Sequence, residues 1–338
     1  MQQAECKTGT AGAELYPLTF EPIFKERIWG GRNLETLYGK KLPARLAIGE
    51  SWEISDRPGD ESVIANGPLK GKTLHWLMDQ CPADLLGPLL PMPRRFPLLV
   101  KIIDARQTLS LQVHPPASVA ALLGGEPKTE LWYVAHAGPD AELFVGLNKG
   151  VTRAQFEQKL ATDSVAECIH RIRVNPGDAM WLPSGRVHAL GADIVVFEIQ
   201  QNSDTTYRVF DWNRVDNRGN RRPLHVPQSL ASIDFLDFEP ALLPHETSGA
   251  GPGQIRPLIK SALFEAAVRG LAGREALRLE DRPMHILGVI EGRLRIGEAS
   301  GTTLVGAGEF CLVPAWCRDV LVSAQPTAAF LHVQRGGD

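Results

Sequence analysis

The fold class follows from residues 177–188, which read Gly-Asp-Ala-Met-Trp-Leu-Pro-Ser-Gly-Arg-Val-His. The spacing Gly-x5-Pro-x-Gly-x2-His places a short apolar run between turn-forming residues and ends on His188. Residues 308–319 repeat this frame as Gly-Glu-Phe-Cys-Leu-Val-Pro-Ala-Trp-Cys-Arg-Asp, with Trp316 at the second glycine position and Asp319 at the histidine position. Such an internal repeat predicts two related units, of which the second has lost a candidate ligand.

The frame at 177–188 resembles the second sequence motif of the cupin β-barrels. Outside the frame, Glu130 precedes a predicted strand at 131–134, whereas His285 stands at the comparable place before 286–290, with no Gln-x-His ahead of it. We therefore expect a mainly β protein with two cupin (jelly-roll) β-barrels and a small helical insert in its N-terminal part. The first barrel should carry the chemistry, and the second should be a degenerate barrel without metal ligands.

Composition and periodicity fit this division. The chain has 32 glycines and 25 prolines among 338 residues, a surplus that favours short strands joined by tight turns. Apolar residues at helical spacing and a following proline cluster predict a helix over 73–90, and a shorter helix is predicted over 152–160. The expected organisation is a disordered tail at 1–14, a catalytic barrel at 15–243 with the insert at about 73–93, a linker at 244–254 and the degenerate barrel at 255–338.

Charge and cysteine usage exclude several classes of protein. There are 36 Lys and Arg residues against 39 Asp and Glu residues, so no overall positive field would attract nucleic acid or an anionic membrane. Five cysteines without CxxC spacing indicate neither a disulfide framework nor a thiolate zinc site. No apolar run approaches the 18 or so residues of a membrane span, and nothing indicates export or an obligate protein partner. We expect a cytoplasmic protein.

Four residues form a candidate metal site. The segment 110–116 alternates with period two, so Gln112 and His114 should share one face of a strand. Glu130 lies at a strand start, and His188 follows a Pro-x-Gly turn. A small barrel gathers inward side chains from several strands, and two imidazoles, a carboxylate and an amide oxygen suit zinc. We expect one zinc ion per chain with an open position for substrate; Gln112 is the weakest ligand of the four.

The chain resembles the type I mannose-6-phosphate isomerases (phosphomannose isomerases), in their short bacterial form, over about residues 18–335. The resemblance is carried by the segments 21–31, 49–53, 109–115, 128–133 and 200–209. It implies that Gln112, His114, Glu130 and His188 are zinc ligands, and that Arg208 is the active-site arginine.

Cations near these strands support a sugar phosphate as substrate. A phosphate group carries a charge near −2, and Lys101, Lys128, Arg208 and Arg214 lie on or beside the predicted ligand-bearing strands, while Ser110 could donate a hydrogen bond. Other interpretations stay open. Arg214 could form a salt bridge within the charged loop 211–222, Lys101 could pair with Glu198 or Glu130, and Ser110 could be an ordinary barrel-facing hydroxyl.

The implied reaction moves a proton between C1 and C2 of an aldose or ketose phosphate through an enediol. Zinc as a Lewis acid would stabilise the developing oxyanion. Glu198 and Lys128 are both candidates for the proton-shuttling residue, and Glu198 could instead orient a zinc-binding histidine. Trp29 and Glu50 are expected to frame the mouth of the pocket, with a place in the core as the alternative for Trp29.

The chain departs from the family pattern in two places. It lacks the large helical domain of longer members, and Glu130 follows His114 by 16 residues rather than about four, so residues 115–129 should form a loop or short helix over the site.

Two other functions stay open. Cupin barrels also hold iron for dioxygenation, and two histidines with one carboxylate would satisfy such a site. The other rival is a non-catalytic sugar-phosphate-binding protein.

Overall fold

A computed structural model describes residues 15–89, 91–215, 219–248, 253–281, 283–298 and 301–336. Its contacts divide the chain into two compact units. The site unit comprises residues 24–51 and 100–243, and the second unit comprises the described parts of 1–23, 52–99 and 244–338. The predicted tail at 1–14 lies outside the described residues, as does part of the predicted linker; the predicted domain boundaries stay a prediction.

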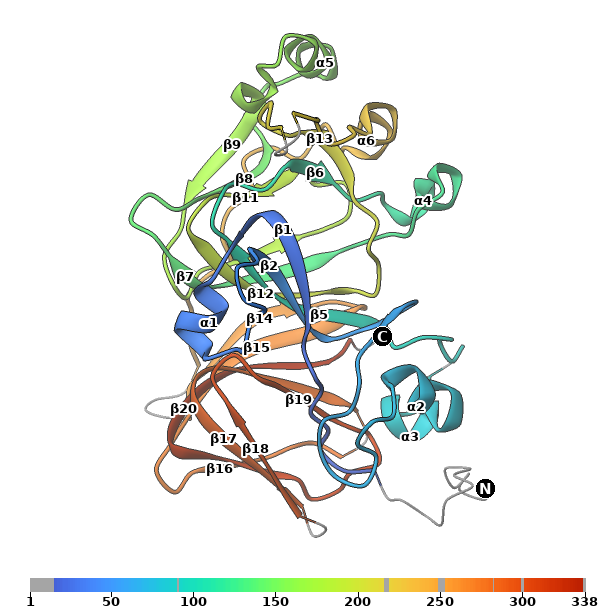
Figure 1. Cartoon of the computed structure of the whole chain (residues 1–338), viewed down its shortest axis with the longest axis vertical. Helices are drawn as coiled ribbons and strands as arrows, with labels where there is room; N and C mark the ends of the chain where they lie inside the picture. The colour runs from blue at the N-terminus through green and yellow to red at the C-terminus, as the bar shows by residue number, and fades with distance from the viewer. Residues whose placement is uncertain are drawn as a thin grey trace. The chain divides into compact units, whose positions relative to one another are not determined.

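Two sheets build the framework of the site (Figure 1). The six-stranded sheet has the order β1-β2-β5-β12-β7-β10, and the five-stranded sheet has the order β13-β6-β11-β8-β9. The strands of the first are β1 (Ile23–Gly31), β2 (Ile48–Ile54), β5 (Leu98–Ala105), β12 (Ile194–Gln201), β7 (Glu130–Ala137) and β10 (Ala179–Leu182). Those of the second are β13 (Tyr207–Phe210), β6 (Leu111–Val113), β11 (His188–Leu190), β8 (Glu142–Leu147) and β9 (Ile169–Arg173).

Because side chains alternate along β6, its polar residue Gln112 points into the space between the two sheets. Leu111 and Val113 of β6 belong to a core cluster with Phe156, on the outer face of the five-stranded sheet. Because successive strand residues point to opposite faces, Gln112 points the other way, toward the six-stranded sheet. The space between the sheets also holds the apolar core built around Trp132, so the polar site continues one end of this core.

Short helices lie at the margins of the chain's sheets. They are α1 (Asn33–Tyr38), α2 (Leu74–Gln80), α3 (Pro82–Leu86), α4 (Ala117–Ala120), α5 (Arg153–Ala161) and α6 (Val226–Ser232), with 3₁₀ turns η1 (Ala121–Leu123) and η2 (Val165–Cys168). The predicted insert forms α2 and α3 and ends at Leu86, earlier than expected; Leu90 lies outside the described residues. The helix predicted over 152–160 is α5, and Thr152 and Gln155 form a reciprocal capping box at its start, an arrangement worth about 1 kcal/mol.

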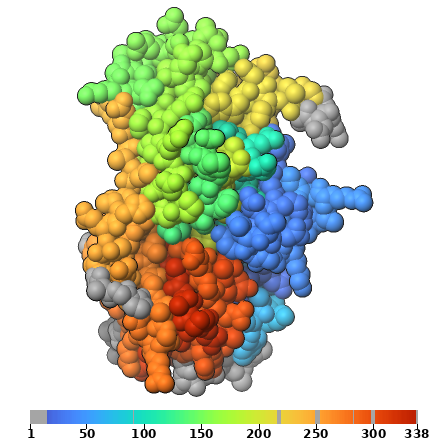
Figure 2. Space-filling model, turned by 90° about the vertical axis from the view of Figure 1, so that its left-hand side faces the viewer, coloured from blue at the N-terminus to red at the C-terminus, as the bar shows by residue number. Residues whose placement is uncertain are grey.

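The second unit is built on a seven-stranded sheet with the main order β14-β15-β20-β17-β18. Its strands are β14 (Ile255–Lys260), β15 (Phe264–Ala272), β16 (Ala276–Arg278), β17 (His285–Glu298), β18 (Gly301–Gly306), β19 (Phe310–Val313) and β20 (Leu321–Arg335). A two-stranded hairpin joins β3 (Asp56–Arg57) to β4 (Asp60–Glu61). On the face shown in Figure 2, the red C-terminal residues lie among orange residues, as expected for β20, which pairs with both β15 and β17.

The mainly β class predicted from the sequence is confirmed. No sheet formed by the described residues closes on itself, so the architecture is one of packed open sheets. Within the same residues, no helix is long and apolar enough to cross a membrane.

Candidate active site

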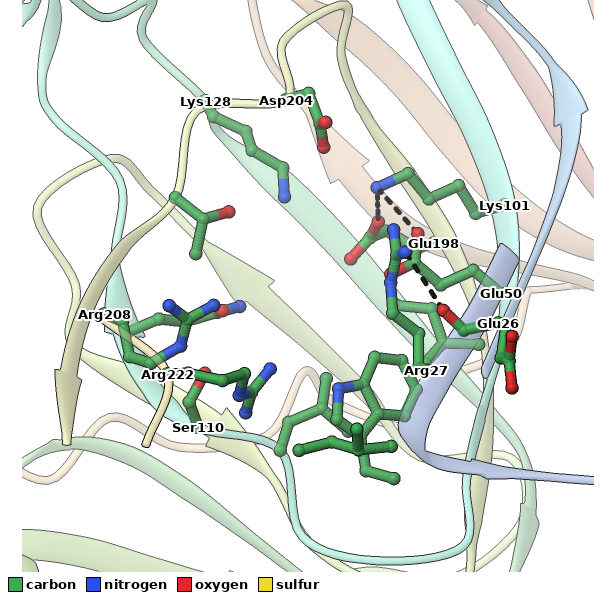
Figure 3. Close-up of a pocket in the computed structure, with 16 residues that line it drawn as sticks. Glu26, Arg27, Glu50, Lys101, Ser110, Lys128, Glu198, Asp204, Arg208 and Arg222 are labelled. Atoms are coloured by element: carbon green, nitrogen blue, oxygen red, sulfur yellow. Dashed lines mark hydrogen bonds and ion pairs between the residues drawn. The ribbon is translucent and has the colours of Figure 1, made fainter. Parts of the chain in front are cut away.

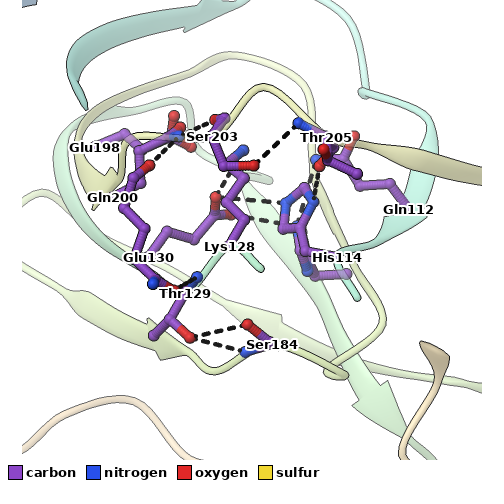
Figure 4. Close-up of polar contacts among 12 residues, drawn as sticks. Gln112, His114, Lys128, Thr129, Glu130, Ser184, Glu198, Gln200, Ser203 and Thr205 are labelled. Atoms are coloured by element: carbon purple, nitrogen blue, oxygen red, sulfur yellow. Dashed lines mark hydrogen bonds and ion pairs between the residues drawn. The ribbon is translucent and has the colours of Figure 1, made fainter. Parts of the chain in front are cut away.

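The predicted metal ligands come together from both sheets, and Figure 4 shows Gln112, His114 and Glu130 among them. His188 begins β11 directly opposite Gln112 of β6, and Glu130 begins β7. The distance from His188 Nε2 to Glu130 Oε1 is 3.2 Å, and that from His114 Nε2 to Glu130 Oε2 is 3.4 Å. Single ligand atoms of His114, Glu130 and His188 all lie within 4.8 Å of one another, and the three side chains are buried.

Backbone carbonyls fix the tautomer of both histidines. His114 Nδ1 lies 2.8 Å from the carbonyl oxygen of Thr205, and His188 Nδ1 lies 2.9 Å from that of Arg186. A carbonyl oxygen only accepts hydrogen bonds, so each Nδ1 must carry the proton that it donates. In a neutral imidazole the other nitrogen, Nε2, then presents a lone pair, and both Nε2 atoms face Glu130.

The charges at this point are set by burial and by Lys128. Burial, helped by the positive charge of Lys128, lowers the pKa of His114 to about 3, so this imidazole is neutral at pH 7. Burial favours the neutral acid of Glu130, but Lys128 and His114 hold the pKa of this carboxyl well below its usual range. Lys128 Nζ lies 2.9 Å from Glu130 Oε2. Despite its burial, Glu130 and Glu198 raise the pKa of Lys128 above its ordinary value.

This arrangement fits a metal ion. Among the described residues, His114 Nε2 and Glu130 Oε1 are buried without a hydrogen-bond partner. Facing lone pairs that share no proton repel one another, and a cation between them removes the repulsion. Imidazole nitrogen and carboxylate oxygen are ligands of first-row divalent metals. Gln112 Nε2 lies 3.3 Å from His188 Nε2, and turning its amide would bring Oε1 to the same place.

A pocket of about 480 Å³ opens beside Gln112 (Figure 3). Its wall is polar and carries charges of both signs. The lining residues are Glu26, Arg27, Ile28, Trp29, Glu50, Lys101, Ile103, Leu109, Ser110, Gln112, Lys128, Glu198, Asp204, Thr206, Arg208 and Arg222.

One end of this pocket is an ion-pair network around Glu198. Glu198 Oε1 accepts a hydrogen bond from Trp132 Nε1 at 2.9 Å, and its Oε2 lies 3.2 Å from Lys101 Nζ. Glu50 links the same lysine, at 3.9 Å, to Arg27, whose Nε donates to it at 2.8 Å. Lys101 thus makes the ion pair with Glu198 that the sequence left open. Backbone carbonyls, rather than Glu198, orient the two imidazoles.

The opposite end is cationic and holds Arg208, Arg222 and Ser110 (Figure 3). Arg208 Nη1 donates to the carbonyl oxygen of Pro223 at 2.8 Å, while its Nε is buried without a partner among the described residues. Burial, followed by the nearby positive charge of Arg222, lowers the pKa of Arg208. An anion at this end would supply the missing acceptor and offset the clustered positive charge.

Comparison with known proteins identifies the family. The model for the catalytic domain of type I phosphomannose isomerase matches residues 18–127. The mannose-6-phosphate isomerase ManA of Bacillus subtilis is 37% identical over 306 residues, which cover 88% of this chain and 93% of that protein. The mannose-6-phosphate isomerase of Streptococcus mutans is 39% identical over 300 residues, covering 88% of this chain and 92% of its own length. This chain belongs to the mannose-6-phosphate isomerase family.

The fold agrees with that assignment. The crystal structure of a mannose 6-phosphate isomerase from Bacillus subtilis superposes with a TM-score of 0.86 at 30% identity. The match covers 94% of this chain and 99% of the other. The family likeness therefore extends over both units, and the resemblance stated from the sequence motifs is confirmed.

Of the residues predicted for the site of this mannose-6-phosphate isomerase family member, Arg214 stands apart. It does not line the pocket; its Nη2 lies 2.5 Å from Asp211 Oδ1, and its Nη1 donates to the carbonyl oxygen of Thr108 at 2.5 Å. This is the salt bridge that the sequence allowed as an alternative, so we leave Arg214 out of the phosphate site. Lys101, Lys128, Glu198, Ser110 and Arg208 all line the pocket, and so do Trp29 and Glu50.

Sequence reasoning missed several lining residues of this pocket, among them Arg27, Asp204 and Arg222. Arg27 has the same strand parity as Trp29 on β1, which was a usable signal. Arg222 lies within the charged loop 211–222, but the path of that loop decides which of its arginines reaches the pocket. The segment between His114 and Glu130 contains α4 and η1, so the expected short helix is present.

Proposed function

We propose that this chain is a zinc-dependent mannose-6-phosphate isomerase, which interconverts mannose 6-phosphate and fructose 6-phosphate through an enediol. One observation carries the proposal: unprotonated imidazole nitrogens and a charged carboxylate converge beside a pocket whose far end holds arginines. Membership of the family and the activity named for its curated members support the choice of substrate.

His114, His188 and Glu130 would hold the zinc ion, with Gln112 as a fourth ligand. Nitrogen and oxygen donors from buried, pre-oriented side chains are what zinc sites use, and carbonyl partners on Nδ1 keep the imidazoles in the binding tautomer. When bound, the metal would supply Lewis-acid stabilisation of the oxyanion that develops as a carbon next to a carbonyl loses its proton.

The substrate would lie across the pocket with its phosphate at the cationic end. Arg208 offers a buried Nε donor there, and the Ser110 hydroxyl lines the same wall. Charge-assisted hydrogen bonds from a guanidinium to phosphate are strong and directional. This placement leaves the carbonyl end of the sugar toward Gln112, Lys128 and Glu198.

Glu198 is the proposed proton acceptor, and Lys128 is the proposed cation that steadies negative charge on the substrate oxygens. Glu198 is held by Trp132 and Lys101, so its carboxylate has a fixed position on the pocket wall. The raised pKa of Lys128 keeps it charged, which favours a role as donor over a role as base.

Within the same proposal, residues 15–243 form the catalytic cupin (jelly-roll) β-barrel with its helical insert, and residues 255–338 form the degenerate barrel. A cytoplasmic location, and action without nucleic acid, membrane or an obligate protein partner, remain predictions from the sequence.

A coupled assay tests the activity. Purified protein is given mannose 6-phosphate, and the appearance of fructose 6-phosphate is followed through a coupled dehydrogenase, before and after chelation and again after zinc is restored. We expect turnover that chelation abolishes and zinc restores. Tight binding of mannose 6-phosphate without turnover by zinc-loaded protein would contradict the proposal and favour a binding protein. Bound iron with oxygen uptake would contradict it in favour of an oxygenase.

A further inference from the structure

The charged loop that follows β13 contains two arginines held by one aspartate. Asp211, which is buried, accepts from Arg222 through Nε at 2.7 Å and Nη2 at 2.6 Å, and from Arg214 through Nη2 at 2.5 Å. The two arginines nevertheless end in different places. Arg222 lines the pocket, whereas Arg214 directs its Nη1 to the carbonyl oxygen of Thr108.

The strap at residues 222–225 explains why Arg222 reaches the pocket. It is attached to β13, the terminal strand of its sheet, because His225 is hydrogen-bonded to both the N–H and the carbonyl of Arg208. The backbone N–H of Arg208 donates to His225 Nδ1 at 3.1 Å, and the N–H of His225 donates to the Arg208 carbonyl at 2.8 Å. Pro223 accepts from Arg208 Nη1, so the strap fixes the guanidinium as well. These bonds place Arg222 beside Arg208 (Figure 3).

The two loop arginines differ in which of their nitrogens make hydrogen bonds. Arg214 donates from Nε and Nη2 to Asp211 and from Nη1 to the carbonyl oxygen of Thr108. Arg222 donates from Nε and Nη2 to Asp211, and no partner of its Nη1 is found within the described part of the chain. Arg208, Arg214 and Arg222 with Asp211 carry a net charge of +2, which matches a phosphate dianion.

We infer that Arg222 is a second phosphate-binding arginine of the substrate pocket, and that Asp211 positions it. The inference rests on the proposed function for the choice of ligand. The phosphate oxygens would be held between Arg208 and Arg222, each braced on the side away from the ligand, by Pro223 and Asp211 respectively. Arg214 is a brace for Asp211 and touches no phosphate.

The test measures the affinity for inorganic phosphate by calorimetry, together with the kinetics on mannose 6-phosphate. Losing one charge-assisted contact costs about 10- to 100-fold in binding. For Arg222→Gln we therefore expect Kd for phosphate and KM to rise about 10- to 100-fold, with kcat within a few-fold, because phosphate binding is shared by ground state and transition state. Arg222→Lys should recover part of the loss. Asp211→Asn should weaken binding by less, since its amide still accepts one bond.

Arg173→Gln is the matched control, because this arginine lies on β9 with its side chain 81% exposed. It should leave both constants unchanged. If Arg222→Gln lowers the thermal midpoint but keeps the wild-type Kd and KM, Arg222 is structural and the inference is overturned. If wild-type protein binds phosphate through Arg222 but does not isomerise mannose 6-phosphate, the inference stands and the proposed function fails. Loss of phosphate binding in Arg173→Gln as well would also overturn it.

Discussion

The two copies of the glycine–proline frame, at 177–188 and 308–319, form the same local structure but place different side chains on it. In the site unit β10 pairs with β7 so that Leu182 lies opposite Glu130; in the second unit β19 pairs with β17 so that Val313 lies opposite His285. The turn bond from residue 186 to Pro183 and that from residue 317 to Pro314 are both 3.1 Å. The two copies thus share this backbone geometry, whereas the group of side chains found among the described residues that could hold a metal ion includes His188 of the first copy and no residue of the second.

Sheet register shows which residues changed. Trp132 pairs with Glu198 in the site unit, and the equivalent Leu287 pairs with His332 in the second unit. His285 and His332 therefore stand in the places of Glu130 and Glu198. Both are buried.

The two regions differ in whether their buried polar atoms have hydrogen-bond partners. Arg269 Nε donates to His332 Nδ1 at 2.9 Å, so His332 carries its proton on Nε2 and donates it to His285 Nδ1 at 2.9 Å. His285 Nε2 then donates to the Glu280 carbonyl at 2.8 Å. Both ring nitrogens of His285 and of His332 thus have a hydrogen-bond partner, whereas in the site unit unprotonated acceptors face one another. Unmatched acceptors, rather than histidines as such, therefore distinguish the cluster that fits a metal ion.

The turns differ as well. Gly185 has φ of 95°, and its place in the second copy is taken by Trp316, while the left-handed residue there is Asp319 with φ of 53°. Asp319 points outward, with its side chain 70% exposed and paired with Arg278. The position that supplies an imidazole in one copy supplies a surface ion pair in the other.

The largest effect is expected from a substitution in the first of these two turns, compared with one at the equivalent position of the second. His188→Ala removes one ligand from a buried set, so we expect loss of bound zinc and of isomerase activity with a chain that still folds, as judged by circular dichroism. Asp319→Asn, at the equivalent position, should keep both. Stoichiometric zinc in His188→Ala would remove this histidine from the ligand set.

Glu198→Gln tests the carboxylate whose counterpart is His332. Removing a proton acceptor should lower kcat by about 10²–10⁴-fold, while zinc content stays at the wild-type level. The measurement is steady-state kinetics with metal analysis of the same sample. Wild-type kcat in the variant would assign proton transfer to another residue.

Arg208→Ala tests the cationic end of the pocket. Zinc should stay bound, and kcat/KM should fall at least about 10- to 100-fold, because one charge-assisted contact with phosphate is lost. Addition of guanidinium salts to the variant checks the chemistry of the missing group. Turnover equal to that of the wild type would contradict a role for Arg208.

The smallest effect concerns the relay of the second unit, which is the hydrogen-bond chain from Arg269 through His332 and His285 to the Glu280 carbonyl. Burial, and then the neighbouring His285 and Arg269, lower the pKa of His332 to about 3, below its ordinary value near 6.5. As the pH falls from about 6.5 toward 3, His332 binds a proton in the unfolded chain but stays neutral in the folded chain. The unfolding equilibrium constant therefore rises by up to about tenfold per pH unit from this group.

Urea unfolding at pH 7 and pH 5 measures this slope. His332→Gln should flatten it relative to the wild type, and the less buried His170→Gln should not. Equal slopes in wild type and His332→Gln would show that the relay does not resist protonation.

Motif spacing and strand alternation predicted that His114, Glu130 and His188 come together, because both depend on local backbone periodicity, and the structure brings these three side chains together. Their role as metal ligands stays a prediction. The same reasoning could not choose between Arg214 and Arg222, since that choice depends on which donors Thr108 and Asp211 accept after the loop has turned back along β13. Likewise, the pairing of Lys101 with Glu198 joins strands almost a hundred residues apart.

The metal stoichiometry of the wild-type chain tests the central contrast most directly. Metal-free protein is titrated with zinc by calorimetry, and the bound metal is then counted per chain by elemental analysis after dialysis. We expect one tightly bound zinc ion per chain, held by the site unit alone. Two equivalents, or none, would contradict it.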